Sequence, residues 1–562
     1  MFSFQGKRKK NSWNREINPD EIFLDSKNLP QFNTQQFEGR IEKPIERVAV
    51  VILGLFFLLV SFIFIGRVWF LQVAKGEEYK ERSENNRLEH TPIFSVRGII
   101  YDRNNIELAW NSLGDDGTFS TRSYIPVDGF AHVLGHVSYP QKDKGGFYYQ
   151  ENFIGKEGIE KIYNDSLTGK NGIRLIEVDA LGNVQSENTI APPVDGSDVT
   201  LTIDSRLQEM LHTFIKQTAS ERGFLGGGGV VMDVLTGEIL ALTSYPEYSP
   251  SILSDGSNRE VISRYVTDER KPFLNRVVSG LYTPGSIVKP YVAMGALSEH
   301  VIDPNKKILS TGSISIQNPY YPDLKTVFMD WKAHGWVNMR EAIGVSSNVY
   351  FYVVGGGYED QKGIGISNIE KYARMFGLGA KTGVDVLGEV DGLIPNPEWK
   401  AETFDGEAWR IGDTYNTAIG QYGFQVTPIQ MVRAVAALAN GGSLVTPHLY
   451  KSEQPLEPIV IPLEESNFQI VREGMRNVVK GGTGSALDIP SVAVAAKTGT
   501  AELGTSKKFV NSWTTGFFPY ENPRYAFAVV MERGSRENLV GASAVMRNFF
   551  DWMTLHTPEY IK

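Results

Sequence analysis

The longest uninterrupted hydrophobic stretch of the chain runs from Val48 to Gly66, between Arg47 and Arg67. Its 19 residues carry no charge, and a helix of that length at about 1.5 Å per residue spans close to the ~30 Å hydrocarbon core of a bilayer. A buried core helix is the alternative, but runs this long are rare in water-soluble domains. A cleaved signal peptide fits poorly, because the run is too long and no small-residue cleavage site follows it. We therefore predict a transmembrane helix over residues 45–66.

The segments on either side of the apolar run differ in charge and regularity. Residues 1–44 are polar, rich in Asn, Gln and Lys and without clear periodicity, which predicts a mostly disordered tail. Lys and Arg are more numerous in this tail than just after the run, a bias that favours a cytoplasmic N-terminus and an extracytoplasmic remainder. After Gly66 a helical rhythm through Val68, Leu71 and Tyr79 predicts that the helix continues for several turns. The sequence has no second run of this length, so we expect a single membrane crossing.

The pattern of predicted elements changes near residue 195, which predicts a domain boundary. Short β-like pieces with turn residues, mixed with helical stretches, occupy residues 91–190. Pro192-Pro193 and the following Asp195-Gly196-Ser197-Asp198 are typical of a linker. We therefore predict an elongated, β-rich domain over residues 67–192 and a second domain over residues 197–562.

The second domain reads as α+β. Its first residues predict a strand and then a helix capped near Asp204 or Ser205. Residues 226–245 predict a β-hairpin that turns at Thr236-Gly237, and residues 525–534 predict another buried strand. Strands at both ends of the domain with helices between them favour a sheet covered by helices.

Composition excludes several classes of function. Hydrophobic residues make up 41% and charged residues 22% of the 562 residues, which is enough apolar content for packed cores. The net charge of −9 argues against a general nucleic-acid role. Because the chain has no cysteine, it has no disulfide, no thiolate nucleophile and no cysteine-based zinc site.

The first of three short polar motifs is Ser286-Ile287-Val288-Lys289. Chance would produce Ser-x-x-Lys once or twice in a chain of this size, and a capping serine beside a solvated lysine is the alternative. Proline and glycine precede Ser286 and an apolar, helix-like sequence follows, which predicts a helix N-terminus whose N–H groups favour an oxyanion. Lys289 would lie one turn on, within reach of the Ser286 hydroxyl. A buried lysine near other positive charge loses its proton more easily, so the pair predicts a serine nucleophile with a lysine base.

The second motif is Ser346-Ser347-Asn348. Ser-x-Asn also occurs at Ser26, Ser83 and Ser186, so the tripeptide decides nothing by itself. Residues 339–356 are a helical, partly apolar setting that can aim side chains into a cleft. We expect Ser346 to relay protons and Asn348 to hold the substrate backbone. Taken alone, however, the tripeptide is better explained as a polar turn within a helix.

The third motif is Lys497-Thr498-Gly499-Thr500, which ends an apolar strand. A strand edge presents N–H and C=O groups to an extended peptide, and Gly499 lets that backbone come close. Lys497 supplies positive charge for a substrate carboxylate and for lowering the pKa of Lys289, while Thr498 and Thr500 can hydrogen-bond the same carboxylate. Lys381-Thr382-Gly383 repeats the tripeptide, but in a glycine-rich loop rather than in a strand.

Taken in order, the three motifs resemble the active-site set of penicillin-recognising serine acyltransferases. Further segments are similar to class B penicillin-binding proteins, and the resemblance covers nearly everything after residue 90; these segments are residues 95–109, 275–290, 388–400, 412–421, 426–442 and 495–502. Residues 330–343 and 346–356 resemble the elongation-type branch, penicillin-binding protein 2, rather than the division-type branch.

The resemblance implies a fold, an activity and a place in the cell. It implies a pedestal (dimerisation) domain followed by a D,D-transpeptidase domain like that of penicillin-binding proteins and β-lactamases, with an all-helical lobe beside the sheet and no cofactor. Ser286 is then the nucleophile toward D-alanyl-D-alanine stem peptides, Lys289 the base, and Ser346 and Lys497 the proton relay. Asn348, Thr498, Gly499 and Thr500 bind substrate, and the oxyanion lies between the N–H groups of Ser286 and Thr500.

The same resemblance implies partners and leaves alternatives. β-Lactams would acylate Ser286 as substrate mimics. A membrane glycosyltransferase of the SEDS family and other elongation proteins are the expected partners in the cell membrane, with residues 45–110 in the contact. A D,D-carboxypeptidase or β-lactamase that hydrolyses the same acyl-enzyme, and a non-catalytic scaffold, are the alternatives.

Two departures from the family pattern stand out. The family usually has Gly-Gln-Gly where this chain has Gly420-Gln421-Tyr422-Gly423, a swap expected to change the rim of the cleft. Some relatives carry a metal between the first two motifs. Asp323, Asp330 and His334 are candidate ligands here, but we favour an exposed loop with surface carboxylates and expect no metal.

Overall fold

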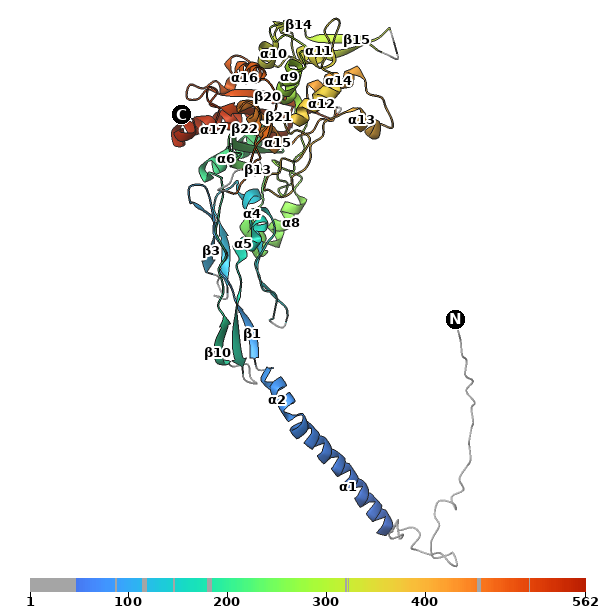
Figure 1. The fold of residues 1–562 in the computed structure, drawn as a ribbon, viewed down its shortest axis with the longest axis vertical. Helices are drawn as coiled ribbons and strands as arrows, with labels where there is room; N and C mark the ends of the chain where they lie inside the picture. Colours follow the sequence, from blue (N-terminus) through green and yellow to red (C-terminus); the bar gives the residue numbers. More distant parts are fainter. Residues whose placement is uncertain are drawn as a thin grey trace, which may run out of the picture. The chain divides into compact units, whose positions relative to one another are not determined.

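Figure 1 shows the fold of the chain in a computed structural model. The structure describes residues 47–85, 88–113, 119–144, 147–178, 184–318, 321, 323–451, 456–504 and 506–561. The tail predicted over residues 1–44 lies outside them. The chain divides into two compact units, one comprising Met1–Glu89 with Glu177–Gln185 and the other His90–Ile176 with Ser186–Lys562.

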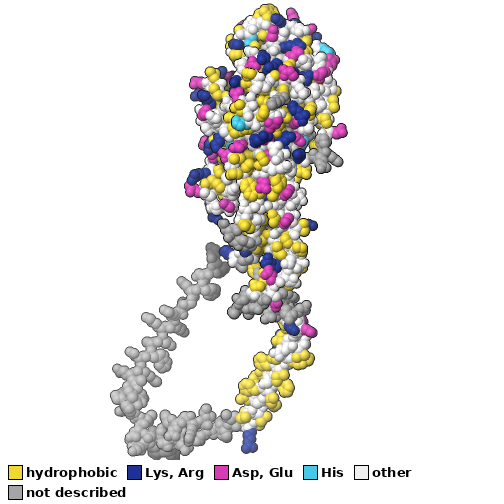
Figure 2. Space-filling model, turned by 90° about the vertical axis from the view of Figure 1, so that its left-hand side faces the viewer, with side chains coloured by type: hydrophobic (Ala, Val, Ile, Leu, Met, Phe, Trp, Pro, Cys, Tyr) yellow, Lys and Arg dark blue, Asp and Glu magenta, His cyan; other side chains and the backbone are white. Residues whose placement is uncertain are grey.

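The first unit is built on one long helix. α1 (Arg47–Trp69) continues through a π-helical turn (Phe70–Ala74), and α2 (Gly76–Asn85) follows. Within the described residues, Arg47–Ala74 is the one helical segment long and apolar enough to cross a membrane. Its apolar side chains are exposed along the helix, as Figure 2 shows in yellow, which suits contact with lipid. The predicted continuation of the helix beyond Gly66 is confirmed.

Short strands dominate the described residues between 88 and 200. One sheet has the order β11-β2-β3-β4, with β11 parallel to β2 and the other pairs antiparallel; another has the order β1-β9-β10, and β5–β8 and β6–β7 pair separately. The elements are β1 (Leu88–Ile93), β2 (Ile100–Tyr101), β3 (Glu107–Leu113), β4 (Ser120–Tyr124), α3 (Ala131–Leu134), β5 (Val137–Ser138), β6 (Gln141–Lys142), β7 (Tyr148–Gln150), β8 (Ile154–Gly155), α4 (Gly158–Ile162), α5 (Asn164–Thr168), β9 (Gly172–Val178), β10 (Val184–Ala191) and β11 (Val199–Thr200).

A buried charge triad ties these small elements together. Glu160 of α4 accepts a hydrogen bond from Arg97 Nε at 2.6 Å through one oxygen, and from Arg122 Nε of β4 at 2.6 Å through the other. All three side chains are fully buried. Burial lowers the pKa of Arg97, although the charge of Glu160 opposes this effect. The single carboxylate therefore compensates two buried cations, and removing it would leave both unpaired.

An antiparallel sheet of five strands, in the order β13-β12-β22-β21-β20, forms the centre of the remaining part. Its strands are β12 (Gly226–Asp233), β13 (Ile239–Tyr245), β20 (Ala495–Leu503), β21 (Phe509–Phe518) and β22 (Tyr525–Ser535). The hairpin predicted over residues 226–245 is confirmed as β12 and β13, with Gly237 of its turn at φ +83°. Because β12 also pairs with β22, this hairpin joins a meander made by the end of the chain.

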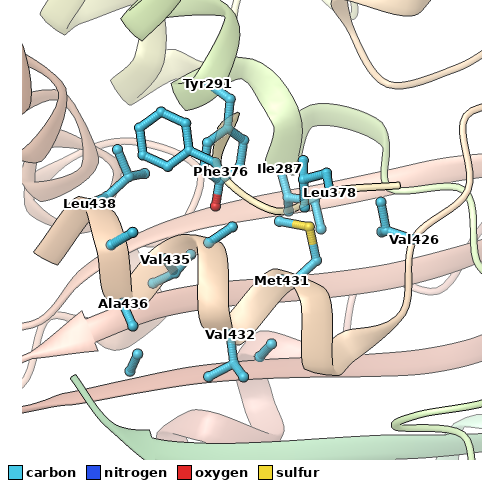
Figure 3. Packing of buried hydrophobic residues seen from close by; sticks show 14 of the residues in the cluster. Ile287, Tyr291, Phe376, Leu378, Val426, Met431, Val432, Val435, Ala436 and Leu438 are labelled. Carbon is cyan, nitrogen blue, oxygen red and sulfur yellow. The ribbon is translucent and has the colours of Figure 1, made fainter. Parts of the chain in front are cut away.

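Helices cover both faces of this sheet. The residues of β22 alternate between two cores: Phe527 and Val529 pack with α6 (Ser205–Arg222) and α17 (Ala542–His556), while Ala528 and Val530 face α15 (Pro428–Ala439). This is the two-residue period of a strand buried on both sides. Figure 3 shows Met431 and Val435 of α15 in the second core. The Asp204 side chain caps α6 by accepting the N–H of Arg206, as predicted.

Helices with a few short strands make up the rest of the unit. Two antiparallel strand pairs, β14–β17 and β15–β16, accompany the helices beside the sheet. The elements are α7 (Pro250–Asp255), α8 (Arg259–Thr267), a 3-10 turn (Gly285–Val288), α9 (Lys289–Ser298), β14 (Ile308–Ser310), β15 (Ser313–Gln317), β16 (Lys325–Met329), β17 (Gly335–Val337), α10 (Met339–Val345), α11 (Asn348–Gly356), α12 (Ile366–Met375), α13 (Pro397–Thr403), α14 (Ile411–Ala418), β18 (Ser443–Leu444), β19 (Ile459–Val460), α16 (Glu465–Lys480), and two 3-10 turns, Ser485–Leu487 and Pro558–Tyr560. The α+β fold class predicted from the sequence is confirmed.

Candidate active site at the edge of the five-stranded sheet

Ser286 lies in a 3-10 turn that leads directly into α9. Gly285, the first residue of the turn, has φ +58°, a conformation that favours glycine. Pro290 stands in the first turn of α9, where its missing N–H costs no helical hydrogen bond. Ser286 itself is half-buried. Its predicted place at a helix N-terminus is confirmed, with the 3-10 turn as the opening turn.

Lys289 is fully buried one turn after Ser286. Its Nζ donates to the backbone oxygen of Ser346 at 2.8 Å, to Ser346 Oγ at 3.3 Å and to Asn348 Oδ1 at 2.7 Å. Within the described residues, these hydrogen bonds of Nζ go to the second motif, and none joins Nζ to the Ser286 hydroxyl. Burial lowers the pKa of Lys289 to about 7, against an opposing effect of the Asp330 charge. A lysine with this pKa is half neutral near pH 7, as a general base must be.

Lys497 and Ser346 complete a chain of polar atoms. Lys497, on β20, is fully buried, and its Nζ donates to Ser346 Oγ at 2.8 Å and to the carbonyl oxygen of Thr498 at 2.8 Å. Ser346 Oγ therefore lies between the two ammonium groups. Burial, and then the charge of Lys289, lower the pKa of Lys497 well below its ordinary 10.5. Ser346 ends α10 in the left-handed conformation, φ +58°, which turns its side chain and backbone oxygen toward the lysines.

The predicted substrate-binding residues lie on the edge strand β20 and at the start of α11. β20 is the last strand of the sheet, so one of its sides pairs with β21 and the other is free of the sheet. Gly499 lies against the serine turn, because a Cβ there would come within 2.8 Å of the Pro284 oxygen. Thr500 is exposed and Thr498 is half-buried. Asn348 begins α11, whose N-cap is Ser347. All three motifs therefore meet at the edge strand β20. Lys497–Thr500 lie inside this strand, which continues to Leu503, and not at its end as the sequence predicted.

Asp330 is a residue that the sequence did not assign to this site. Its carboxylate accepts hydrogen bonds from Ser347 Oγ at 2.8 Å, Ser310 Oγ at 3.2 Å and the N–H of Val349 at 3.0 Å. Burial by itself raises the pKa of Asp330, but the donated hydrogen bonds outweigh it and hold the pKa below the ordinary value of 3.8. The carboxylate thus anchors the turn that carries Ser346 and Asn348. A lone aspartate in a loop gives no sequence signal for this role.

The surface loop predicted for the three candidate metal ligands is correct only for Asp323, which is exposed. Asp330 is buried, and so is the ring of His334, whose Nε2 lies 3.6 Å from Asp330 Oδ1. The surface-loop interpretation is therefore wrong for these two residues. In the part of the chain that the structure describes, no group of three His, Asp or Glu side chains is arranged to hold a metal ion.

The second Lys-Thr-Gly tripeptide lies in a loop, as its sequence context predicts. Glu389 accepts hydrogen bonds from the N–H and hydroxyl of Thr382 and from the N–H of Gly383. Lys381 is exposed. Because a carboxylate of the same loop takes these donors, they are not available to a substrate carboxylate.

Comparisons with known proteins agree with this geometry. The model of the penicillin-binding protein transpeptidase domain matches residues 227–551, and that of the penicillin-binding protein dimerisation domain matches residues 117–201. The chain belongs to the class B penicillin-binding proteins.

Within that class the chain is similar to MrdA proteins. It is 30% identical to the peptidoglycan D,D-transpeptidase MrdA of Escherichia coli K12, over 91% of this chain and 94% of that protein. The division-type relative FtsI of the same organism is 28% identical over 73% of this chain and 63% of FtsI. The solved structure of Pseudomonas aeruginosa PBP2 with WCK 5153 superposes with a TM-score of 0.69 at 31% identity, covering 84% of this chain and 98% of that one. Helicobacter pylori PBP2 in complex with MreC also gives a TM-score of 0.69, at 28% identity, and covers 84% and 99%. The predicted resemblance to penicillin-binding protein 2 is confirmed.

Proposed function

We propose that this protein is a peptidoglycan D,D-transpeptidase of cell-wall elongation that works through an ester on Ser286. The curated MrdA relatives carry this activity in their names. The observation that supports the serine mechanism most directly is the position of Ser346 Oγ, within 2.8 Å of Lys497 Nζ and 3.3 Å of Lys289 Nζ, both buried. Two lysines with lowered pKa values and a shared hydroxyl form a proton relay next to a nucleophilic serine.

Acylation begins with proton transfer from Ser286 Oγ to neutral Lys289. The Oγ attacks the carbonyl carbon between the two D-alanines of a donor stem peptide, and the N–H groups of Ser286 and Thr500 stabilise the oxyanion. The C–N bond breaks and D-alanine leaves as an amine, after its nitrogen receives a proton through Ser346 from the lysine pair. An acceptor amine then attacks the ester carbonyl and gives a proton to the lysine pair. As the C–O bond breaks, the lysine pair passes that proton to Ser286 Oγ, which leaves free Ser286 and a new amide cross-link.

Substrate binding in this proposal uses the open side of β20. An extended stem peptide adds to the strand edge, where N–H and C=O groups are available. Its terminal carboxylate meets Lys497, Thr498 and Thr500, and Asn348 hydrogen-bonds its backbone. Gly499 keeps this strand close to Ser286, because a side chain there would displace the serine turn. A β-lactam, which carries a carboxylate next to a reactive amide, binds in the same way.

The proposed location is the cell membrane, with α1 as a single anchor, the N-terminus in the cytoplasm and the catalytic domain outside it. Residues 67–192 are the proposed pedestal and 197–562 the proposed transpeptidase domain. A Helicobacter relative is solved with MreC, and another neighbour is described as a peptidoglycan synthase complex. We infer that this chain also joins an elongation assembly, including a SEDS-family glycosyltransferase contacted by residues 45–110. Co-purification that survives replacement of residues 45–110 as a whole would count against that contact.

The first test is intact-protein mass after incubation with benzylpenicillin, for wild type and Ser286→Ala. A stable penicilloyl adduct on the wild type, absent from the variant, supports the nucleophile and slow hydrolysis of the ester. Destruction of the antibiotic without an adduct indicates a hydrolase instead. An intact antibiotic with no adduct removes the support for a serine mechanism. Product analysis of stem-peptide substrates with and without an acceptor amine then separates cross-linking from carboxypeptidase activity.

A further inference from the structure

The loop between α14 and α15 holds a non-glycine residue in a backbone conformation that favours glycine. Tyr422 has φ +61°, and its neighbours Gly420 and Gly423 have φ +76° and +82°. Non-glycine residues in this region are strained and persist where their surroundings hold them. Tyr422 is also the residue by which this loop departs from the Gly-Gln-Gly pattern of the family. The contacts of the Tyr422 ring are therefore what must hold this backbone conformation.

Three aromatic rings surround the Tyr422 side chain. The ring centroids of Trp399 and Trp409 lie 5.7 and 5.8 Å from that of Tyr422 in edge-to-face geometry, and Phe404 stacks on it at 6.3 Å. Lys400 Nζ lies 5.9 Å from the ring centroid. We name Trp399, Phe404, Trp409 and Tyr422 the aromatic cage. Its contacts come from α13, from the loop after it and from the Tyr422 loop, so they join two separate stretches of chain.

A buried ion pair lies next to the Tyr422 ring. Lys400 Nζ donates to Asp413 Oδ2 at 2.7 Å, and the Lys400 side chain is 3% exposed. Asp413 also accepts the N–H of Arg410 and so caps α14. Within the cage, Tyr422 is thus held by rings on three sides and by an anchored cation, which explains how its strained backbone is maintained.

The other end of the loop contacts the serine turn. The carbonyl oxygen of Gly420 accepts the N–H of Gly285 at 2.9 Å. A Cβ on Gly420 would lie 2.2 Å from the Gly285 oxygen, so the two backbones are in direct contact. A Cβ on Gly285 would lie 3.2 Å from the Thr500 oxygen. The residue before Ser286 is therefore clamped between the Tyr422 loop and the edge strand β20.

We propose that Tyr422 is a positioning residue for acylation: the aromatic cage fixes its loop so that Gly420 holds the Gly285–Ser286 backbone against β20. The inference rests on the proposed role of Ser286 as nucleophile. Because the N–H of Ser286 is one of the two proposed oxyanion donors, a small displacement of this backbone weakens the transition state more than it weakens binding.

The test is a set of substitutions at one position in the full-length, detergent-solubilised protein. Tyr422→Gly relieves the strained φ but removes the ring, Tyr422→Ala removes the ring and keeps the strain, and Tyr422→Phe keeps the ring. Glu359→Gly is the matched control, since Glu359 is exposed, has φ +51° and lies outside the catalytic set. Benzylpenicillin acylation is followed over a range of concentrations, which separates the first-order acylation constant from the non-covalent Kd. Melting temperatures are measured in parallel.

We expect Tyr422→Gly and Tyr422→Ala to lower the acylation constant about 10-fold or more, with Kd changed less than about 3-fold. Tyr422→Phe and Glu359→Gly keep the wild-type constant. Glycine suits φ +61°, so Tyr422→Gly is the variant best able to fold. An acylation constant for Tyr422→Gly equal to that of the wild type overturns the inference, whatever its melting temperature. So does a loss confined to Kd. If the wild type itself is not acylated, the proposed function fails rather than the role of Tyr422.

Discussion

The pH dependence of Ser286 acylation follows directly from the burial of Lys289. Its pKa is lowered to about 7 in the folded protein. If neutral Lys289 is the base, the neutral fraction is about 1% at pH 5, about one half at pH 7 and nearly complete at pH 9. The second-order constant for acylation by benzylpenicillin should therefore rise about 50-fold from pH 5 to pH 7 and only about 2-fold from pH 7 to pH 9.

A lysine with the ordinary pKa would give a different curve. Its neutral fraction would rise about tenfold with each pH unit up to pH 9, without a plateau. Lys289 and Lys497 are both buried, and both donate to Ser346 Oγ. The rising part of the pH–rate curve will therefore report the titration of the lysine pair. Lys289→Arg is the matched variant, because arginine keeps the charge and cannot lose its proton. We expect no acylation of this variant between pH 5 and pH 9.

The assay is rapid quench of the full-length protein with excess benzylpenicillin, followed by intact-mass measurement of the adduct fraction at each pH. Unfolding curves at the same pH values show that the protein stays folded. A rate constant that continues to rise tenfold per unit up to pH 9 would refute the neutral-lysine mechanism. Acylation of Lys289→Arg at a rate near that of the wild type would refute it as well.

Three further predictions concern buried charges. Asp330→Asn should destabilise the protein by about 1–3 kcal/mol in denaturant unfolding, because the hydrogen bonds to the Ser346–Asn348 turn lose their charged acceptor. It should also move the rising, acidic part of the pH–rate curve for acylation (the acid limb) to lower pH, since the Asp330 charge raises the pKa of Lys289. An unchanged limb would contradict that electrostatic link. Glu160→Gln should lower the unfolding free energy by about 3–5 kcal/mol, because two buried arginines lose their shared carboxylate. Glu187→Gln, at an exposed ion pair, should lower it by less than about 1 kcal/mol. Equal losses of unfolding free energy would show that burial does not matter here. Lys289 loses its proton near pH 7 in the native protein but near pH 10.5 in the unfolded chain. Unfolding between these pH values therefore takes up a proton. The unfolding free energy of the wild type should then rise relative to that of Lys289→Met by on the order of 2 kcal/mol between pH 6 and pH 9. A constant difference between the two proteins would contradict the lowered pKa.

The sequence determined those elements that depend only on residues near one another in the chain. Residues 48–66 are apolar on every side of the helix, so a membrane-length helix forms whatever surrounds it. Asp204 accepts an N–H two residues away, and Gly237 provides the positive φ of its own hairpin. The three motifs were visible for the same reason, because each is a few consecutive residues with fixed side-chain chemistry.

Tertiary structure decided everything that depends on distant neighbours. The pairing of β12 with β22 joins residues about 300 positions apart, and no local pattern encodes which strands become neighbours. The contact of Lys289 and Lys497 with one hydroxyl, and the burial that lowers their pKa values, exist only after the sheet and helices close around them. The contacts of Asp330 and Tyr422 arise in the same way, from groups that fold against them. The sequence by itself therefore determined the membrane helix, the fold class and the chemistry available, since these depend on residue type and short-range spacing. The tertiary structure decided the protonation of the two lysines and the alignment of the motif side chains, because burial and long-range contacts set both.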